Sequence, residues 1–337
     1  MPINPVRAYQ QTLSATLAYY KPGIEELVYN SNVVFNTVKE KGNYRSFDGP
    51  EIRHHLQFAK QGTQWATGYD FLENPPIELF NDAVFQPSAI YAPISFTGTE
   101  IRANTGDRMI PLIRSYVQAA TESLNDGLEI AINGNGTSFN GRDMVGLGAA
   151  LPIVTNTGVY GGISRTIPEW QTTTWDANSA FPTIGTQVTS TTIQPMLREI
   201  MGRRMKGNRS ADLLVMSQEH FSALESSMVA HQRIVNQTRL GAIGFSALEF
   251  IGSGRRADAV LASGIRASMP ANTTYGLESR SLYVYYRDEF AFDRLFEGDG
   301  QMPLNQDALA QFIGWEGQFV LGNPQYSWRF YDSNPAA

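Results

Sequence analysis

The stretch of sequence that decides the fold is PLIRSYVQAATESLNDGLEIAIN, residues 111–133. Apolar residues recur there at spacings of three and four, which predicts one apolar stripe along an α-helix; the stripe comprises Met109, Ile113, Tyr116, Val117, Ala120, Leu124, Leu128 and Ala131. Gly134 and Gly136 end the pattern. At 1.5 Å per residue the helix is about 35 Å long, roughly twice the usual length in globular proteins. Asn125 and Gly127 lower its intrinsic propensity, so we expect tertiary packing to hold it.

The sequence before this helix falls into four parts. Residues 1–20 are a mostly polar arm, which we expect to be extended. A helical pattern runs from Pro22 to Gly42, with proline near its start and glycine past its end. Residues 43–85 alternate aromatic and polar residues between turn signals, which predicts a hairpin with little core of its own. Residues 91–98 alternate apolar and polar residues and predict a strand.

The sequence after the long helix mixes short elements without regular order. Residues 137–190 are rich in Gly, Thr, Asn and Ser, and helices are predicted over 193–205 and after Ser217. Short strands are predicted at 212–216, 247–251, 259–261, 281–286, 318–321 and 326–331. Because this part lacks the steady β-α-β alternation of a doubly wound sheet, the fold class is α+β.

Composition excludes several classes of protein. The chain has 337 residues, a length at which we expect about two domains. Of these residues 42% are hydrophobic, which excludes intrinsic disorder. Only 17% are charged, against the usual ~25%, so we expect much of the surface to be covered by sister subunits. The net charge of −6 argues against a protein whose main function is to bind nucleic acid.

The chain contains no cysteine, which removes disulfides, thiolate nucleophiles, iron–sulfur clusters and cysteine-ligated zinc. No apolar run approaches the ~20 residues of a membrane helix, and the start lacks a signal peptide. We therefore expect a soluble chain that is not exported and does not bind membranes.

No catalytic, cofactor or metal site is predicted. His54 and His55 are interpreted as a solvated pair in the hairpin. His220 and His231 could share a helical face, but the spacing of a zinc-binding His-Glu-x-x-His helix is absent. The sequence also lacks the Gly-x-Ser-x-Gly elbow of serine hydrolases and the phosphate loop of nucleotide hydrolases.

One near-match to a dinucleotide-binding fingerprint starts at Gly252 and runs through Gly254 to Ala257. The fingerprint requires a helix directly afterwards, whose N-terminus meets the pyrophosphate. Residues 257–265 read instead as a strand, so we interpret the motif as a turn between two strands with Arg255 and Arg256 exposed. A nucleotide-dependent enzyme that uses Gly252 and Gly254 stays open as an alternative.

The order of parts resembles the major capsid protein of tailed double-stranded DNA bacteriophages, which has the Hong Kong 97 fold that is shared with encapsulins. A polar arm, a helix, a hairpin with little core, one very long helix, a Gly/Thr-rich region and a final run of strands follow one another. Local sequences similar to phage coat proteins support the resemblance at residues 146–151, 160–165, 170–176, 213–217 and 247–250.

The resemblance implies a division of the chain. It assigns 1–42 to an N-terminal arm and its helix, and 43–92 to an extended loop. It assigns 93–140 together with 300–337 to a peripheral domain that contains the spine helix, and 141–299 to an axial domain.

The resemblance also implies a function that is structural rather than enzymatic. It implies a chain that assembles with itself, as hexamers and pentamers, into the icosahedral head enclosing phage DNA without sequence-specific binding. It implies a separate scaffolding protein and a portal as partners, leaves open a decoration protein, and needs no cofactor. The location is then the virion, after synthesis in the host bacterial cytoplasm. An encapsulin-type compartment shell is the alternative with the same fold.

Two groups of residues are candidates for contacts between subunits. Aromatic residues of the arm and loop lack the periodicity that would bury them in their own chain: Tyr9, Tyr19, Tyr20, Tyr44, Phe47, Trp65, Tyr69 and Phe71. Four arginines are expected on loops of the axial domain, near the axis where subunits converge: Arg233, Arg239, Arg255 and Arg256.

Overall fold

The protein is described by a computed structural model that covers nine segments of the chain. These are residues 12–13, 19, 32–57, 63–71, 80–103, 109–228, 247–262, 269–294 and 307–335. Helices occur together with two sheets of mixed strand direction, which confirms the α+β class.

The helices are α2 (Val33–Glu40), α3 (Gly98–Ala103), α4 (Met109–Asn133), α5 (Leu147–Ala150), α6 (Ala177–Ala180), α7 (Ile193–Arg203) and α8 (Gln218–Met228), with short 3-10 turns η2 (Pro168–Trp170), η4 (Ser279–Ser281) and η5 (Pro324–Tyr326). The strands are β1 (Tyr44–Ser46), β2 (Ile52–Gln57), β3 (Phe80–Phe85), β4 (Ser88–Thr97), β5 (Val159–Tyr160), β6 (Ile163–Ser164), β7 (Thr173–Asp176), β8 (Leu213–Met216), β9 (Ala247–Gly252), β10 (Arg255–Leu261), β11 (Thr273–Leu277), β12 (Leu282–Arg294), β13 (Ala308–Leu321) and β14 (Trp328–Tyr331).

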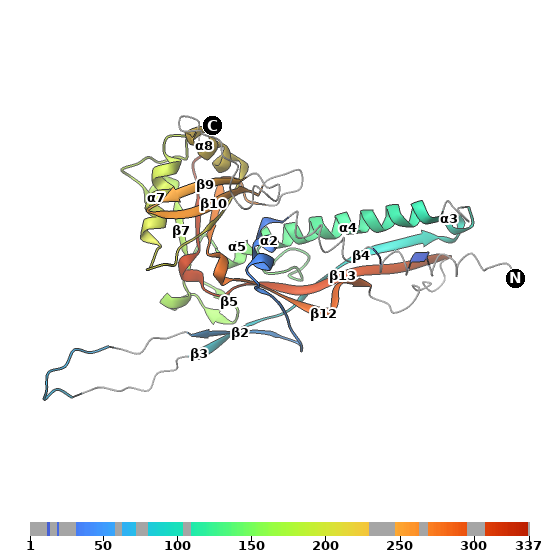
Figure 1. The fold of residues 1–337 in the computed structure, drawn as a ribbon, viewed down its shortest axis with the longest axis horizontal. Coiled ribbons are helices and arrows are strands. Elements are labelled where there is room, and N and C mark those ends of the chain that lie inside the picture. The colour runs from blue at the N-terminus through green and yellow to red at the C-terminus, as the bar shows by residue number, and fades with distance from the viewer. Residues whose placement is uncertain are drawn as a thin grey trace.

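The long helix is present as α4, which runs beside β4 and β13 (Figure 1). Its predicted stripe is buried at Ile113, Val117, Ala120, Leu124 and Leu128, with Ile132 extending it by one more turn. Gly127 has a packing reason, because a Cβ there would lie 2.5 Å from Cδ1 of Ile90 on β4. The glycine that lowers helix propensity therefore allows helix and strand to approach closely.

Two sheets organise the rest of the chain. The four-stranded sheet has the order β1-β12-β13-β4, and its longest antiparallel ladder pairs Ala308–Gly317 of β13 with Thr97–Ser88 of β4. The six-stranded sheet has the order β7-β14-β11-β8-β10-β9. Helices α7 and α8 lie against this second sheet at one end of the molecule (Figure 1), over a core of their own. No helix in the described part of the chain is long and apolar enough to span a membrane.

The chain crosses between the sheets at two short turns. η4 leads from β11 to β12, and η5 leads from β13 to β14. Residues 282–294 therefore lie in the four-stranded sheet and residues 328–331 in the six-stranded sheet, so the predicted division at residue 300 does not follow the sheets. The reason is that sheet membership of a short apolar strand depends on tertiary pairing, which its own pattern does not encode.

The predicted hairpin forms between β2 and β3, which pair from Ile52↔Phe85 to Gln57↔Phe80. Residues 44–46 are not part of it, because they form β1 and pair in parallel with β12. The helix predicted from Pro22 is described only as α2, and its earlier residues lie outside the described part of the chain.

Candidate subunit-interface surfaces

The root of the β2–β3 hairpin is anchored in its own chain. Along β2 every second residue is buried, beginning at Ile52, and on β3 Ala83 and Phe85 are buried. The Phe85 ring lies 5.1 Å from the Tyr160 ring in an edge contact. The Tyr160 hydroxyl accepts a hydrogen bond of 2.9 Å from the backbone N–H of Leu321. A neighbouring strand and side chains from distant parts of the chain therefore fix the root.

The two histidines of the hairpin lie in different surroundings. His55 is exposed as expected, and its Nδ1 lies 2.5 Å from Oδ1 of Asp82. His54 is only 9% exposed, and its Nδ1 lies 2.8 Å from the Tyr285 hydroxyl. Burial, helped by Arg45 and His55, lowers the pKa of His54 to about 4. The prediction of a solvated pair is wrong for His54, because strand alternation turns it toward the body of the protein.

The tip of the same hairpin, residues 63–71, makes its own turn. The backbone N–H and hydroxyl of Thr67 donate to the Asp70 carboxylate at 2.7 and 2.9 Å, and the backbone N–H of Asp70 donates to the Thr67 carbonyl at 2.9 Å. The Gln64 side chain donates to the Phe71 carbonyl at 3.0 Å. The two hydrogen bonds that Thr67 donates to the carboxylate lower the pKa of Asp70, since they favour its charged form. The tip is thus shaped by local bonds.

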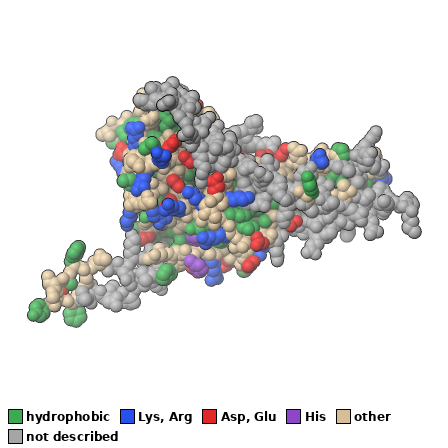
Figure 2. All heavy atoms as spheres, viewed as in Figure 1, with side chains coloured by type: hydrophobic (Ala, Val, Ile, Leu, Met, Phe, Trp, Pro, Cys, Tyr) green, Lys and Arg blue, Asp and Glu red, His purple; other side chains and the backbone are tan. Residues whose placement is uncertain are grey.

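This tip carries aromatic side chains that have no cover. Trp65, Tyr69 and Phe71 are 103%, 104% and 96% exposed. Figure 2 shows hydrophobic side chains standing clear of the body on this projecting segment. Three large apolar groups in water on one short turn make this tip a candidate interaction surface.

The other aromatic candidates divide into two groups. Phe47 is only 8% exposed, with the Arg287 guanidinium 4.8 Å from its ring centre. Tyr44 is half-buried and stacks on Tyr286 at 4.0 Å. The expectation that these two find no place in their own chain is wrong, because β1 joins the four-stranded sheet. Tyr19 is exposed, whereas Tyr9 and Tyr20 lie outside the described residues.

The arginine candidates lie on a strand where they are described. Arg255 donates to the Asn208 side-chain oxygen at 2.6 Å, and Arg256 pairs with Glu249 at 3.2 Å. Both belong to β10 and not to a loop, because the turn after β9 is tight. Arg233 and Arg239 lie outside the described part of the chain.

The same turn shows whether the sequence from Gly252 to Ala257 can bind a dinucleotide. Ser253 and Gly254 have positive φ angles of 51° and 77°, and the chain continues into β10, antiparallel to β9. No helix follows that could present its N-terminus to a pyrophosphate, so the nucleotide-enzyme alternative loses its structural basis. In the described residues no group of three or more His, Asp or Glu side chains could hold a metal ion.

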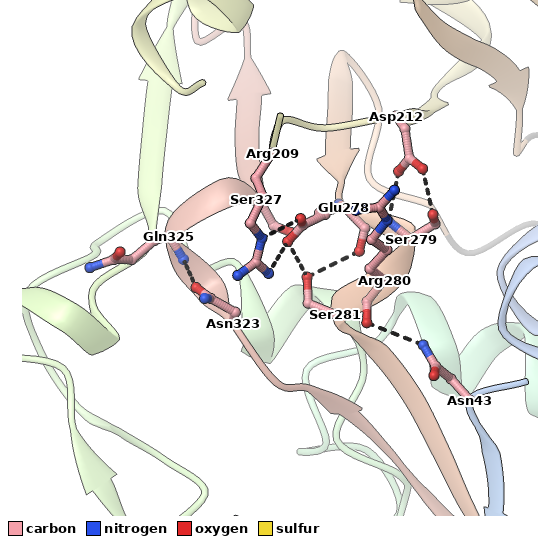
Figure 3. A network of polar contacts seen from close by, with 10 residues as sticks. All are labelled: Asn43, Arg209, Asp212, Glu278, Ser279, Arg280, Ser281, Asn323, Gln325 and Ser327. Carbon is pink, nitrogen blue, oxygen red and sulfur yellow. Dashed lines mark hydrogen bonds and ion pairs between the residues drawn. The ribbon is translucent and has the colours of Figure 1, made fainter. Parts of the chain in front are cut away.

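Sequence reasoning missed a polar network where the chain crosses between the sheets (Figure 3). Nε and Nη2 of Arg209 donate to the two carboxylate oxygens of Glu278 at 2.7 Å each. The same guanidinium lies 4.3 Å from the ring centre of Tyr326 in η5. Ser281 donates to Glu278 at 2.8 Å. One arginine therefore joins both crossings, and the hydrogen bond with Glu278 raises its pKa.

A second carboxylate supports the same crossing. Asp212 accepts a hydrogen bond of 2.6 Å from the backbone N–H of Ser279, the first residue of η4, and also bonds the Ser279 hydroxyl. The signal in the sequence was a glutamate, Glu278, that directly follows the buried strand β11. Because a buried carboxylate needs a partner, such a residue predicts a cation nearby but not which one.

Comparison with known proteins bears on the fold. No family model matches the sequence, and no curated protein matches it with significance. Among solved structures, a chain of the cyanophage A-1(L) capsid aligns with a TM-score of 0.58 and 19% identity over 86% of this chain and 90% of that chain. A capsid chain of a native GTA particle aligns at 0.54 and 10% identity over 88% and 89%. A chain of Mycobacterium phage Bobi aligns at 0.51 and 10% identity over 88% and 90%.

The chain thus has the fold of phage capsid chains along most of its length and most of theirs. This confirms the Hong Kong 97-like fold that the sequence resemblance implies.

Proposed function

We propose that this chain is the major structural protein of an icosahedral shell that encloses phage double-stranded DNA. The observation that carries the proposal is the match of its fold to a cyanophage capsid chain. The match covers 86% of this chain and 90% of the cyanophage chain. Copies would associate as hexamers and pentamers, and the shell would be located in the virion after synthesis in the host cytoplasm. A scaffolding protein and a portal would take part in assembly.

In this proposal the four-stranded sheet with α4 serves as the peripheral domain, and the six-stranded sheet with α7 and α8 serves as the axial domain. An excess of acidic over basic residues, 32 against 26, suits a wall that does not hold its DNA tightly. An encapsulin-type compartment would share the fold, but the solved structures compared above are phage and GTA particles.

The hairpin tip supplies the contact between copies. A large aromatic side chain buries about 150–250 Å², so three would bury about 450–750 Å² on a neighbour. A standard interface buries about 800 Å² on each partner. The tip would therefore provide much of one interface. A tip that docks on a different surface of the next copy makes a heterologous contact, which closes into rings by rotation.

The test is a variant with Trp65→Ser, Tyr69→Ser and Phe71→Ser. We expect the wild-type chain to form particles of megadalton mass, seen by size exclusion and electron microscopy. We expect the variant to give a folded subunit with an unchanged melting temperature and no particles. The matched control, Thr63→Ser with Ala66→Ser, changes the same tip but keeps its aromatic residues and should assemble.

Two results would contradict these statements. A wild-type chain that stays a monomer or dimer at high concentration overturns the shell. Particles of normal yield from the triple variant overturn the role of the hairpin tip and leave the shell in place.

A further inference from the structure

A groove of about 400 Å³ lies at the root of the hairpin, next to the crossing network of Figure 3. It is bounded by the end of β2, by η2, and by the two crossings η4 and η5. The residues that line it include Arg209 and Arg280, Tyr283 and Tyr326, and Asn323 and Gln325.

One of the two arginines already binds side chains of its own chain. Arg209 forms the bidentate pair with Glu278 and covers Tyr326, so it is a fixed part of the wall. The side chain of the other arginine has no such partners among the described residues. Arg280 is exposed, and its side chain makes no hydrogen bond, ion pair or ring contact with the residues that the structure describes. Its backbone is held, because its carbonyl accepts a hydrogen bond of 3.2 Å from the Asn43 side chain.

Besides the arginines, the groove lining contains two histidines and one glutamate. His54 is neutral above about pH 5, since its pKa is lowered to about 4. His55 lies against Asp82 on the hairpin. Glu169 is the one carboxylate among the lining residues, and it forms no bond with Arg280 among the described contacts. The groove thus presents an available guanidinium beside amide groups and aromatic rings.

We propose that this groove binds a carboxylate-bearing extended segment of a second copy of the chain. A guanidinium recognises a carboxylate by two parallel hydrogen bonds, and amides can bond the backbone of an extended segment. The proposal rests on the proposed shell function.

Two observations favour a second copy as the occupant. The groove is continuous with the root of the hairpin whose tip is proposed to reach the next subunit. The chain carries a net charge of −6, so another copy offers carboxylates in excess to an available cation. A single free arginine with Glu169 nearby fits DNA phosphates poorly, because nucleic-acid affinity depends on several cations acting together.

The first experiment changes charge without disturbing the fold. Arg280→Glu should lower particle yield at least tenfold, and Arg280→Gln should lower it less, with melting temperatures of the subunits unchanged. The control is Arg142→Glu, an exposed arginine in the turn after α4, which should assemble normally. Normal particle yield from Arg280→Glu would overturn the proposal. Normal yield with loss of packaged DNA would overturn it in favour of phosphate binding.

The second experiment identifies the occupant in assembled particles. Gln57 lies in the groove lining at the end of β2 and is exposed. Replacing it with the photoreactive p-benzoylphenylalanine and irradiating particles should cross-link two copies, seen as a dimer on a denaturing gel. Mass spectrometry should locate the cross-link beside an Asp or Glu. Particles that form but give no cross-linked dimer overturn the groove proposal alone, whereas a chain that forms no particles overturns the shell as well.

Discussion

The root and the tip of one hairpin lie in opposite surroundings. On the root, every second residue of β2 is buried, and Phe85 on β3 is 4% exposed. On the tip, residues 63–71 are all exposed. The root belongs to the core of its own chain, and the tip has no core to join.

The contrast shows how to read aromatic residues that lie near each other in sequence. Alternation with a period of two places a side chain on a face that can be buried. Aromatic residues on a tight turn, such as Trp65 and Tyr69, have no such face and are exposed.

The largest effect is expected at Phe85. Phe85→Ala removes a buried ring that packs on Tyr160, and large-to-small changes of this kind destabilise a core by about 3–5 kcal/mol. Urea unfolding of the subunit measures the loss. Phe80→Ala is the control, since Phe80 on the same strand is 75% exposed, and it should change stability by less than about 0.5 kcal/mol. Equal losses for the two would show that the root is not anchored as described.

A smaller loss is expected at Gly161, which packs against the root. Its φ is +59°, and a Cβ there would lie 2.6 Å from the Phe85 ring and 2.9 Å from Cβ of Ala83. Gly161→Ala should therefore combine backbone strain with overpacking, together about 2–4 kcal/mol. Gly162 is the matched control, because its φ is +76° but nothing lies within 4 Å of its Cβ position. Gly162→Ala should show only the strain, about 1 kcal/mol.

The two glycine variants separate strain from packing. If both lose the same amount in urea unfolding, the root does not press on the turn between β5 and β6. A larger loss at Gly161 also predicts faster exchange of the amide hydrogens along β2 and β3, because local opening of the root becomes easier.

Acid should loosen the root through His54. A histidine with a pKa of about 4 when folded and 6.5 when unfolded takes up its proton mainly on unfolding. The contribution of His54 to the free energy of unfolding is therefore constant above about pH 7, falls as the pH drops from about 6.5 to about 4, and then levels off. The expected loss is about 1–2 kcal/mol between pH 7 and pH 5.

His54→Gln should reduce the slope of stability against pH in this window, because glutamine does not titrate. His220 has a similarly lowered pKa, about 4, caused by burial beside Thr274, so His220→Gln should remove a comparable share from the body of the protein. A slope that is unchanged by His54→Gln would show that His54 has an ordinary pKa in the folded chain and is not buried in the root as described.

The sequence predicted the elements that have strong periodicity. The stripe of α4 and the alternation of β4 each identify their own structure, because burial repeats with the period of the element. The short apolar run of β8 identifies a strand that is buried along its whole length. The sequence could not predict that β12 lies in the four-stranded sheet and β14 in the six-stranded sheet, because the pairing of a short strand depends on tertiary contacts. It also could not predict the pair of Arg209 with Glu278, which are 69 residues apart.

The candidate interface shows the same limit. Trp65 and Phe71 are exposed as expected, because no pattern gives them a buried face. Phe47 was misread, because its burial depends on the pairing of β1 with β12 and on Arg287. Aromatic composition alone does not separate the two situations.

The smallest effect on the subunit is expected at Thr67, which shapes the tip. Thr67→Ala removes the hydroxyl that donates to Asp70 at 2.9 Å and keeps the backbone bond at 2.7 Å. The pKa of Asp70 should therefore rise part of the way toward its ordinary value, as followed by NMR titration, while the urea midpoint stays the same. Thr63→Ala, another exposed threonine of the tip, is the control and should leave the Asp70 pKa unchanged. Because a looser turn presents the aromatic residues less uniformly, particles of Thr67→Ala should also assemble more slowly than wild type, as light scattering would record. An unchanged pKa of Asp70 would show that the hydroxyl does not close the turn, and the tip would then be shaped by its backbone alone.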